Sequence, residues 1–352
     1  MAIQASSLSI VIPALNEAEC LPKLLEDLSR QQNIQLDIVV VDGGSTDQTV
    51  TICKNFASAN LLPLKLYNTA AGRGLQMNEG TKHCAASDFL FLHADTRIND
   101  PLLLSNAQRA INDARGNHCH LHVAGHFPVK FIDVNTETSA YYFYECKTYL
   151  NRPDCINGDQ GFWISKEYFD WLGQFDESLP YMEDAKLALK IFHTGKWITL
   201  PGYIETSARR FEKEGFTKRQ ILNSFLCNFN AMGVNFFFQS ALDVYKTQDH
   251  TQKLELRPFL QLAHQQMNGD GITFALKRWY QTGAYIANNA WQLAFALDCR
   301  RNRKHAIEPG IHKPSSLQFY DRHLARFAQW PIVKALTGLL TIFWFYSLFL
   351  TR

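Results

Sequence analysis

The sequence predicts an α/β protein with a doubly wound, mostly parallel sheet and a helical C-terminal extension. Three observations support this prediction. Short apolar runs alternate with segments of helical periodicity through the first hundred residues. These runs are hydrophobic at successive positions, as in strands that helices cover on both faces. Polar or glycine-rich segments follow three of the runs, where parallel sheets place their ligands.

The expected strands and helices follow one another along the chain. In the first hundred residues we expect strands over residues 8–13, 36–42, 62–67 and 88–95, separated by helices over residues 17–31, 47–59 and 74–86. Beyond residue 119 the pattern changes, because residues 120–132 alternate between polar and apolar side chains as an antiparallel strand does. Further helices are expected over residues 137–150, 183–195, 217–246 and 254–300.

The length of 352 residues allows one full domain and an appendage. We expect a boundary near residue 240, which gives a first domain over residues 1–240, a helical extension of unassigned role over 241–330 and an apolar helix over 331–352. The net charge of +2 does not indicate nucleic acid as a partner. The eight cysteines contain no CxxC pair, which is typical of reduced thiols in a cytosolic protein.

The C-terminal segment is strongly apolar. No charged residue occurs between Ala335 and Thr351, a run of 17 residues, which is about 25 Å long as a helix and slightly shorter than the ~30 Å hydrocarbon core of a bilayer. We expect it to contact a membrane, across the bilayer or in its interface; a buried or dimerising helix is the alternative. The first residues lack the features of a signal peptide. A cytoplasmic approach to an anionic surface is favoured by Arg300, Arg301, Arg303, Lys304, Arg322 and Arg326.

The segment VDGGSTDQT, residues 41–49, joins an expected strand to an expected helix. Asp42 ends the strand, where its carboxylate can accept a hydrogen bond from the N–H edge of a base such as uracil or guanine. Gly43 and Gly44 allow a tight turn and a close approach of the backbone to a ligand. The polar residues that follow are expected to cap the helix, which does not exclude a binding role for Asp42.

A second glycine-rich segment, AAGRGLQMNEG at residues 70–80, carries a cation at Arg73. Backbone N–H groups at a helix N-terminus and a guanidinium together form an anion site. The pattern differs from GxxxxGK[ST], so a P-loop is excluded. An ordinary loop with a solvated arginine is the alternative.

Acidic residues follow at two further places. Asp95 in the segment HAD is a hard oxygen ligand suited to Mg²⁺ or Mn²⁺. His93 is expected on the same face of an extended strand, as a second ligand or as a hydrogen-bonding partner of phosphate. Glu183 and Asp184 start an expected helix, where they either stabilise the helix dipole or supply a general base for a hydroxyl nucleophile.

Three histidines lie close together in HCHLHVAGH, residues 118–126. Alternate residues of one strand share a face, but regular spacing along a single strand matches tetrahedral zinc poorly. We therefore expect His118, His120 and His122 on an exposed strand face or beside an acceptor cleft.

Between residues 7 and 225 the sequence resembles family 2 glycosyltransferases of the GT-A fold. Six segments occur in the order found in that family: SIVIPALNE, VVVDGGSTDQT, RGLQMNEG, FLHADT, GDQGFWIS and GQFDESLPYMEDAKLALKI. The run from GRGLQMNEG to MED resembles a bacterial subfamily described as transferase 2, radical-SAM/selenodomain-associated. The resemblance implies a nucleotide-sugar donor, a divalent cation and inversion at the anomeric carbon.

The resemblance also implies roles for individual residues. It implies a nucleoside pocket at Pro13, Asn16 and Glu17 and a base contact at Asp42, beside which Gly43 is expected to approach the nucleotide-sugar. It implies a diphosphate border at Arg73 and Gln76 and a metal ligand at Asp95. Asp159 is expected to contact a sugar, and the catalytic carboxylate is expected at Asp184 beside Glu183. His93 departs from the family pattern, which more often has Asp at this position. A second carboxylate would bind the cation with more negative charge than a histidine does. The family's QxxRW segment is not evident, and Arg209 or Arg210 is expected to close over the pyrophosphate instead.

We therefore expect an inverting glycosyltransferase that moves a sugar from a nucleotide-sugar, with UDP as the expected nucleotide, to an acceptor hydroxyl at the inner face of a bacterial cytoplasmic membrane. A sugar-phosphate nucleotidyltransferase has a similar sheet. Those enzymes generally carry a basic, glycine-rich loop after the first strand, where this chain has the acidic segment PALNEAE. A non-catalytic, membrane-bound nucleotide-sugar sensor is a second alternative, and only His93 supports it.

Overall fold

The computed structural model describes residues 7–59, 62–117, 122–134, 139–248, 254–311 and 314–351. The chain forms two compact units, each built from two stretches of sequence. The first unit consists of Met1–Val134 and Lys147–Ala208, and the second of Asn135–Cys146 and Arg209–Arg352.

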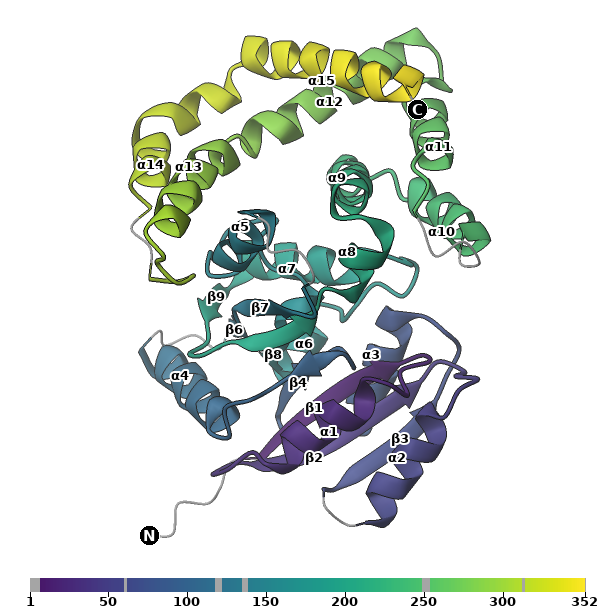
Figure 1. Cartoon of the computed structure of the whole chain (residues 1–352), viewed down its shortest axis with the longest axis vertical. Helices are drawn as coiled ribbons and strands as arrows, with labels where there is room; N and C mark the ends of the chain where they lie inside the picture. Colours follow the sequence, from purple (N-terminus) through teal and green to yellow (C-terminus); the bar gives the residue numbers. More distant parts are fainter. Residues whose placement is uncertain are drawn as a thin grey trace. The chain divides into compact units, whose positions relative to one another are not determined.

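A seven-stranded sheet forms the centre of the first unit (Figure 1), with the strand order β3-β2-β1-β4-β8-β6-β9. Its strands are β1 (Ser7–Ala14), β2 (Gln35–Asp42), β3 (Leu64–Asn68), β4 (Asp88–Phe91), β6 (Val123–His126), β8 (Phe162–Ser165) and β9 (Lys196–Thr199). All neighbouring pairs are parallel except the two that β8 makes with β4 and β6. The predicted mostly parallel sheet is therefore confirmed.

Helices cover both faces of this sheet, as a doubly wound fold requires. They are α1 (Leu21–Ser29), α2 (Thr49–Ser58) and α4 (Leu103–Asn117) on one face, and α3 (Arg73–Thr81) and α6 (Lys166–Trp171) on the other. On the first face the helices close an apolar cluster with Ile10 and Ile38. On the second face a Cβ at Gly80 of α3 would lie 2.5 Å from Val11, so the helix packs directly on the strand. Burial on both faces explains the continuous apolar runs.

A second sheet of three strands joins β5 (Thr96–Arg97), β10 (Ile204–Ser207) and β7 (Val129–Ile132). The single strand predicted over residues 120–132 was wrong, because β6 and β7 belong to different sheets. Pro128 separates them and cannot donate a ladder hydrogen bond. The N–H of Phe127 bonds instead to the carbonyl oxygen of Gln160 (2.9 Å).

The second unit is helical in the part that the structure describes. It comprises α5 (Ser139–Lys147), α8 (Arg209–Glu214), α9 (Phe216–Met232), α10 (Phe236–Gln248), α11 (Arg257–Asn268), α12 (Ile272–Asn288), α13 (Trp291–Lys304), α14 (Ser315–Phe319) and α15 (Pro331–Thr351). The long helices predicted over residues 217–246 and 254–300 were wrong in length. Gly233 ends α9 in the left-handed conformation (φ 70°), and Gly271 precedes α12 with φ 92°.

The compact units differ from the division expected from the sequence. Residue 240 lies inside α10, whereas the chain passes from the first unit to the second between Ala208 and Arg209. The stretch around α5 belongs to the second unit although its sequence lies within the first. Compactness does not assign a role, so the separate roles expected for residues 1–240, 241–330 and 331–352 stay predictions.

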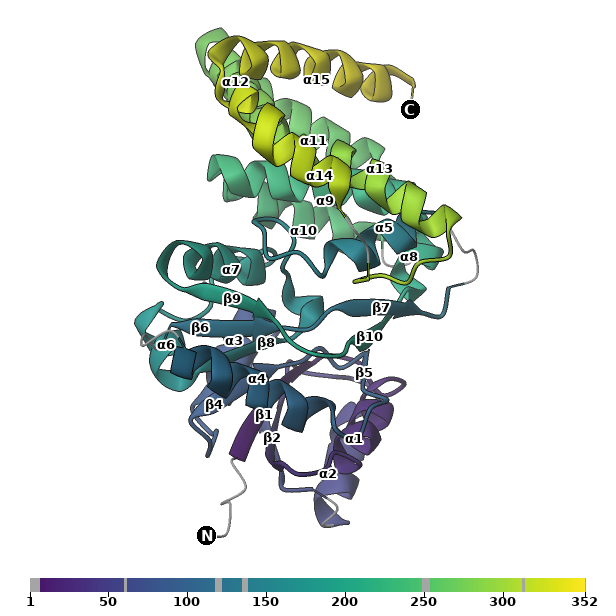
Figure 2. The same ribbon diagram turned by 90° about the vertical axis from the view of Figure 1, so that its left-hand side faces the viewer.

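Helices α12 and α15 cross with their backbones in contact, and Figures 1 and 2 show α15 running alongside α12. A Cβ at Gly283 of α12 would lie 2.1 Å from the carbonyl oxygen of Lys334 and 2.5 Å from the nitrogen of Gly338. Farther along α15, Phe345 is 2% exposed, and its ring lies 5.5 Å from that of Trp279. The two helices therefore pack along most of their length.

Helix α15 is long and apolar. Over Pro331–Leu350 its mean hydropathy is 1.7, and 11% of the segment is buried within the protein. By length and composition alone, it is the one helix within the described ranges that could cross a membrane.

Candidate active site

Parallel strands end together at one edge of the seven-stranded sheet. Pro13 of β1 lies beside Val41 of β2, and Ala14 lies beside Asp42. The segments that follow β1, β2 and β4 therefore begin at the same edge, where parallel sheets bind their ligands.

Asp42 ends β2, and the residue is 3% exposed. Its Oδ2 atom accepts hydrogen bonds from the backbone N–H groups of Gly44 (2.9 Å) and Ser45 (3.0 Å). Its Oδ1 atom is buried and has no hydrogen-bond partner among the described residues. A buried oxygen without a donor is unfavourable, so Oδ1 is suited to accept an N–H group from a ligand.

Gln76 of α3 holds the ends of β1 and β2 together. Its Nε2 atom donates to the carbonyl oxygens of Ala14 (2.9 Å) and Val41 (2.8 Å), and its Oε1 atom accepts from the N–H of Gly72 (3.3 Å). A Cβ at Gly43 would lie 3.0 Å from this amide, so the small residue makes room for the clamp. The expected place of Gln76 beside a diphosphate stays a prediction, because its amide groups are bound to the backbone.

Hydrogen bonds join the connections that follow β1 and β2. The N–H of Asn16 bonds to Oγ of Ser45 (2.8 Å), and its Oδ1 atom accepts from the N–H of Thr46 (2.8 Å). The N–H of Glu17 bonds to Oγ1 of Thr49 (2.8 Å). Asn16 has a left-handed backbone (φ 56°), which asparagine tolerates better than most residues. Residues expected in the nucleoside pocket thus belong to one bonded pair of loops.

Arg73 begins α3 and is ion-paired with Glu183 of α7 (Glu183–Thr194). Its Nε atom donates to Oε1 of Glu183, whose side chain is 1% exposed. Burial raises the pKa of Glu183 above its usual value, although Arg73 opposes that shift. Burial lowers the pKa of Arg73, but Glu183 and then Asp184 outweigh burial and raise it. Arg73 therefore keeps its positive charge beside two carboxyl groups.

Asp184 is fixed by backbone N–H groups at both carboxylate oxygens. Its Oδ2 atom accepts from Gly158 (2.6 Å) and its Oδ1 atom from Ala185 (2.7 Å). A Cβ at Gly158 would lie 2.9 Å from Oδ2 of Asp184 and 2.9 Å from Nε2 of His93. Gly158 was not expected at the site, although a glycine next to an acidic residue in NGDQG allows a close backbone approach.

His93 is held by Asp159. Its Nδ1 atom lies 2.9 Å from Oδ1 of Asp159, while Nε2 lies on the side of Gly158. Burial lowers the pKa of His93, but the carboxylate of Asp159 outweighs burial and raises the pKa above its usual value. The pairing fixes the direction of the imidazole ring.

The strand before His93 is shorter than predicted. β4 ends at Phe91, whereas the sequence suggested a strand to residue 95. His93 opens a turn instead, closed by a hydrogen bond from the N–H of Thr96 to its carbonyl oxygen (3.1 Å). The prediction that His93 and Asp95 share one face of an extended strand was wrong, because the chain leaves the strand before either residue.

Asp95 is partly exposed, and no group of three or more His, Cys, Asp and Glu ligands is arranged for a metal ion in the described part of the chain. Magnesium does not need such a group when one or two protein ligands and a substrate phosphate complete its shell. Asp95 offers one hard oxygen. Nε2 of His93 offers a second ligand, since ligating histidines commonly pair their other nitrogen with a carboxylate, here Asp159. The two residue types suit a cation that a diphosphate completes, and binding of a cation here stays a prediction.

The contacts link the candidate residues of the first unit into one connected site. Arg73 and Gln76 lie one turn apart on α3, so the clamp on β1 and β2 and the ion pair with α7 share a helix. From α7 the contacts continue through Asp184 and Gly158 to His93. Glu183, Asp184 and Asp159, which are far from Arg73 and His93 in the sequence, are thus brought close to these two side chains.

Other candidate residues lie outside this connected set. Arg209 and Arg210 begin α8 of the second unit, so their expected closure over a pyrophosphate stays a prediction. The first two histidines of HCHLHVAGH lie outside the described residues. His122 stacks on Tyr168, with 4.4 Å between the ring centroids.

Residues 9–173 match the family model described as Glycosyl transferase family 2. Among curated proteins, a PGL/p-HBAD biosynthesis glycosyltransferase of Mycobacterium bovis is 34% identical over 111 residues, which cover 31% of this chain and 43% of that protein. The 4,4'-diaponeurosporenoate glycosyltransferase of Staphylococcus haemolyticus is 32% identical over 96 residues, which cover 27% of this chain and 25% of that protein. The chain thus spans less than half the length of these relatives.

Among solved structures, that of S. aureus TarS 1-349 in complex with UDP has 15% sequence identity and a TM-score of 0.47, covering 94% of this chain and 88% of that chain. The family match overlaps the ordered motifs and six of the seven strands of the large sheet. Through residues 9–173, this chain is therefore similar to glycosyl transferase family 2.

Proposed function

We propose that this protein is an inverting glycosyltransferase that moves a sugar from a nucleotide-sugar donor to an acceptor hydroxyl. One observation carries the proposal: residues of the types needed for a base contact, a diphosphate and a sugar are connected at the ligand-binding edge of the family 2 domain. These are a buried acceptor at Asp42, a fixed cation at Arg73 and a fixed carboxylate at Asp184. The bacterial subfamily that the motifs resemble is part of the same proposal.

The buried Oδ1 atom of Asp42 supports a uridine nucleotide as the donor carrier. Uracil presents a single N3–H donor at its edge, which matches a single buried acceptor. Cytosine presents an acceptor at that position and does not match. The bonded loops at Asn16 and Glu17, next to Pro13, are proposed to form the remainder of the nucleoside pocket.

Arg73 is proposed to stabilise the departing nucleoside diphosphate. Its side chain is 36% exposed, so an anion can reach the guanidinium while Glu183 fixes its direction. A cation that is already oriented stabilises developing negative charge without further rearrangement. Closure by Arg209 or Arg210 is proposed from the family resemblance alone.

Asp184 is proposed to remove the proton from the acceptor hydroxyl. Each of its oxygens accepts one backbone N–H and keeps a further lone pair that can take a proton. The acceptor oxygen then attacks the anomeric carbon from the side opposite the diphosphate. A bond forms between this oxygen and the anomeric carbon as the bond from that carbon to the diphosphate oxygen breaks, so the configuration at the carbon is inverted. Asp159, beside His93, is proposed to contact one of the sugars.

A divalent cation, Mg²⁺ or Mn²⁺, is proposed to bind at Asp95 and Nε2 of His93. When bound, it would neutralise charge on the leaving diphosphate. The role of Asp159 in this arrangement is to orient His93.

We further propose that transfer takes place at the inner face of the cytoplasmic membrane. Helix α15 is long and apolar enough to meet a bilayer, and basic residues precede it in the sequence.

Donor binding and nucleotide release test the proposed reaction. A UDP-sugar with Mn²⁺ is expected to raise the melting temperature of the full-length protein more than a GDP- or CDP-sugar does. The Asp184→Asn protein is expected to keep this stabilisation but to release UDP at least about 100-fold more slowly, because it lacks the base. Asp113→Asn, at an exposed position on α4, is the matched control and is expected to behave like the wild type.

Other outcomes distinguish the alternatives. Turnover of Asp184→Asn at the wild-type rate would exclude this residue as the base. Release of pyrophosphate from a nucleoside triphosphate would identify a nucleotidyltransferase. Donor binding without release of UDP, in the presence of Mn²⁺ and membrane extracts as acceptor, would identify a sensor.

A further inference from the structure

The second unit carries an apolar surface that the proposed reaction does not use. Its members are between 54% and 81% exposed. They are separated by three, four or seven residues on α15, apart from one adjacent pair, so they share one side of the helix. We call this side the α15 face; it is formed by Ile332, Leu336, Leu339, Leu340, Phe343 and Leu350. Exposed apolar surface of this extent marks an interaction site.

The opposite side of α15 is packed against other helices along its length. Gly338 contacts the backbone of α12 at Gly283, and Phe345 is buried against Trp279. Near the C-terminal end, the hydroxyl of Tyr346 lies 3.2 Å from His264 of α11. A single helix that crosses a bilayer contacts lipid on all sides. Only one side of α15 is available to lipid, because the other side packs on α11 and α12.

Helix α12 is not suited to cross a bilayer together with α15. Lys277 is exposed, and Arg278 is ion-paired with Asp270 at 2.5 Å. The neighbouring Trp279 contacts Phe345, so these charges lie level with the apolar C-terminal half of α15. Charges in hydrocarbon are strongly unfavourable. Crossing would therefore place these charges in lipid or separate the two helices.

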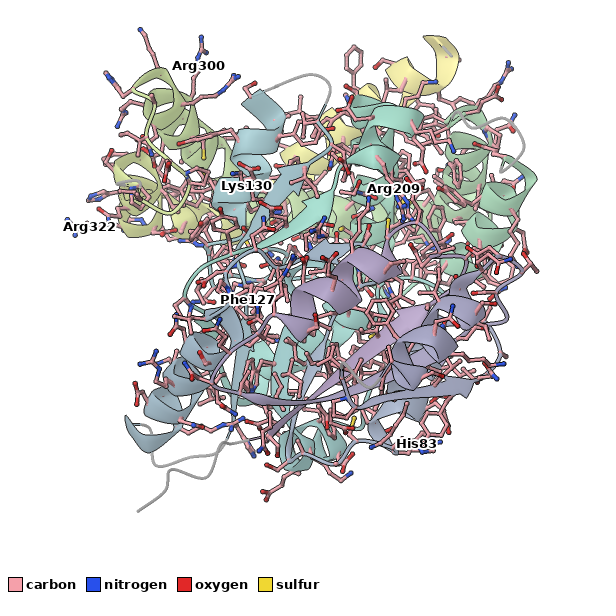
Figure 3. The ribbon with its side chains drawn as sticks, turned by 60° about the horizontal axis from the view of Figure 1, so that its bottom comes forward. His83, Phe127, Lys130, Arg209, Arg300 and Arg322 are labelled. Atoms are coloured by element: carbon pink, nitrogen blue, oxygen red, sulfur yellow. The ribbon has the colours of Figure 1, made fainter. Side chains whose placement is uncertain are left out.

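The part of the second unit that precedes α15 in the sequence is basic. Between residues 272 and 334 the sequence has ten Lys and Arg residues but three Asp and Glu residues, whereas the whole chain carries a net charge of +2. Arg300 and Arg322 are exposed, and Figure 3 shows their side chains extending outward from the ribbon. Such an excess attracts anionic lipid headgroups. It also disfavours a symmetric contact with a second copy of the chain, which would bring like charges together.

We propose that α15 lies in the plane of the interface of an anionic membrane, with the α15 face in lipid and its opposite side on α11 and α12, and does not cross the bilayer. This arrangement keeps the contact between Gly283 and Gly338. Exposed Trp330, just before α15, and exposed Trp344 suit the headgroup level of a membrane. The inference refines the proposed membrane location and does not depend on sugar transfer.

Vesicle binding by the full-length protein tests the lipid-facing role. We expect binding to vesicles of phosphatidylcholine with phosphatidylserine, and weaker binding to phosphatidylcholine alone. The double substitution Leu340→Glu with Phe343→Glu, at positions 71% and 77% exposed, is expected to weaken binding about tenfold or more. Leu189→Glu, on α7 and 42% exposed, is the matched control and should bind like the wild type. Equal binding by the double variant and the wild type would overturn the proposal.

Topology separates a helix in the interface from a spanning helix. In bacterial spheroplasts that produce the full-length protein with a C-terminal epitope tag, we expect the tag to be protected from added protease and the protein to be released by alkaline carbonate. Cleavage of the tag in intact spheroplasts would show that α15 crosses the membrane and would overturn the proposal. So would a dimer in lipid-free solution that the double substitution dissociates without changing vesicle binding.

The test is independent of the reaction. Protein that binds vesicles as expected but releases no UDP from any donor leaves this inference standing and refutes the proposed transferase. Protein that releases UDP but ignores anionic vesicles refutes the inference alone.

Discussion

The two carboxylate oxygens of Asp42 have different surroundings. Oδ2 accepts two backbone N–H groups, and Oδ1 is buried without a partner among the described residues. In an Asp42→Asn protein we expect the amide oxygen to accept the hydrogen bonds from the two backbone N–H groups, because an NH₂ group in that position would place donor against donor. The NH₂ group then replaces Oδ1, where it opposes N3–H of uracil but complements N3 of cytosine.

We therefore expect Asp42→Asn to weaken UDP binding about tenfold or more and to raise the affinity for CDP relative to UDP. Calorimetric titration of the full-length protein with both nucleotides measures the ratio. Asp113→Asn on α4 changes an exposed acid in the same way and should leave the ratio unaltered. An unchanged ratio in Asp42→Asn would mean that the base binds elsewhere.

The places of several candidate site residues in the fold could be predicted from the sequence because their neighbours are local. Asp42 ends an apolar strand before two glycines, and Glu183 and Asp184 begin a helix. The hydrogen-bond partners of these and other site side chains could not be predicted in the same way. The amide of Gln76 binds carbonyl oxygens of two strands, and Gly158 lies between His93 and Asp184, which are distant in sequence.

At the level of elements, a buried carboxylate joins helix α1 to strand β5. Asp27 is 0% exposed and accepts hydrogen bonds from Nε of Arg97 (2.6 Å) and from the N–H of Ile98 (3.0 Å). Burial alone would raise the pKa of Asp27. The bonds from Arg97 and Ile98 outweigh burial and hold the pKa below its usual value of 3.8.

Because this pKa is lower in the folded chain, Asp27 stabilises the fold above its usual pKa, and that contribution is lost as the pH falls below it. We expect Asp27→Asn to reduce the free energy of unfolding by roughly 2 kcal/mol near neutral pH and to make stability less sensitive to acid. Urea unfolding near neutral pH and at about pH 3 measures both effects. Equal stability of variant and wild type near neutral pH would show that the negative charge of Asp27, which also pairs with Arg30, contributes nothing to stability.

The crossing of α12 and α15 gives a second prediction about elements. Gly283→Ala places a Cβ 2.1 Å from the carbonyl oxygen of Lys334, so the helices must separate. We expect the free energy of unfolding to fall by about 1–3 kcal/mol, seen as a lower melting temperature. Gly116→Ala, on α4, meets no atom within 4 Å and should instead leave the melting temperature unchanged or slightly higher. No difference between the two variants would contradict a close crossing.

The first four strands could be predicted because each is a local apolar run between turns. The division of residues 120–132 could not, because it depends on which strands of two sheets lie beside β6 and β7. In the second unit, apolar periodicity continues past Gly233 and Gly271, so it suggested longer helices than the backbone allows. Tertiary packing decides both the division of residues 120–132 between two sheets and the ends of these helices.

At the level of the whole molecule, the chain enters the second unit twice. α5 interrupts the sequence of the first unit, but its aromatic side chains pack within the second. The ring of Tyr141 lies 5.0 Å from that of Phe216, and the ring of Phe143 lies 5.6 Å from that of Phe295. The sequence predicted a helix here, but its partners lie more than sixty residues onward, so no local pattern could assign it to a unit.

This discontinuity predicts how the protein can be divided. A fragment of residues 1–208 retains α5 without the partners of Tyr141 and Phe143, and we expect it to aggregate. The same fragment of residues 1–208, with a Gly/Ser linker in place of residues 135–146, should remain soluble because it lacks the aromatic side chains of α5. We call it the linker fragment. Gel filtration and circular dichroism of the two fragments measure the difference.

The linker fragment also tests where the donor binds. Asp42, Arg73 and Asp184 all belong to the first unit, so we expect UDP with Mn²⁺ to raise its melting temperature, as in the full-length protein. The same fragment lacks α15 and should not bind anionic vesicles. If it is folded but does not respond to UDP, the donor site must include residues of the second unit, and Arg209 and Arg210 are the first to substitute, since the family resemblance assigns them to the diphosphate.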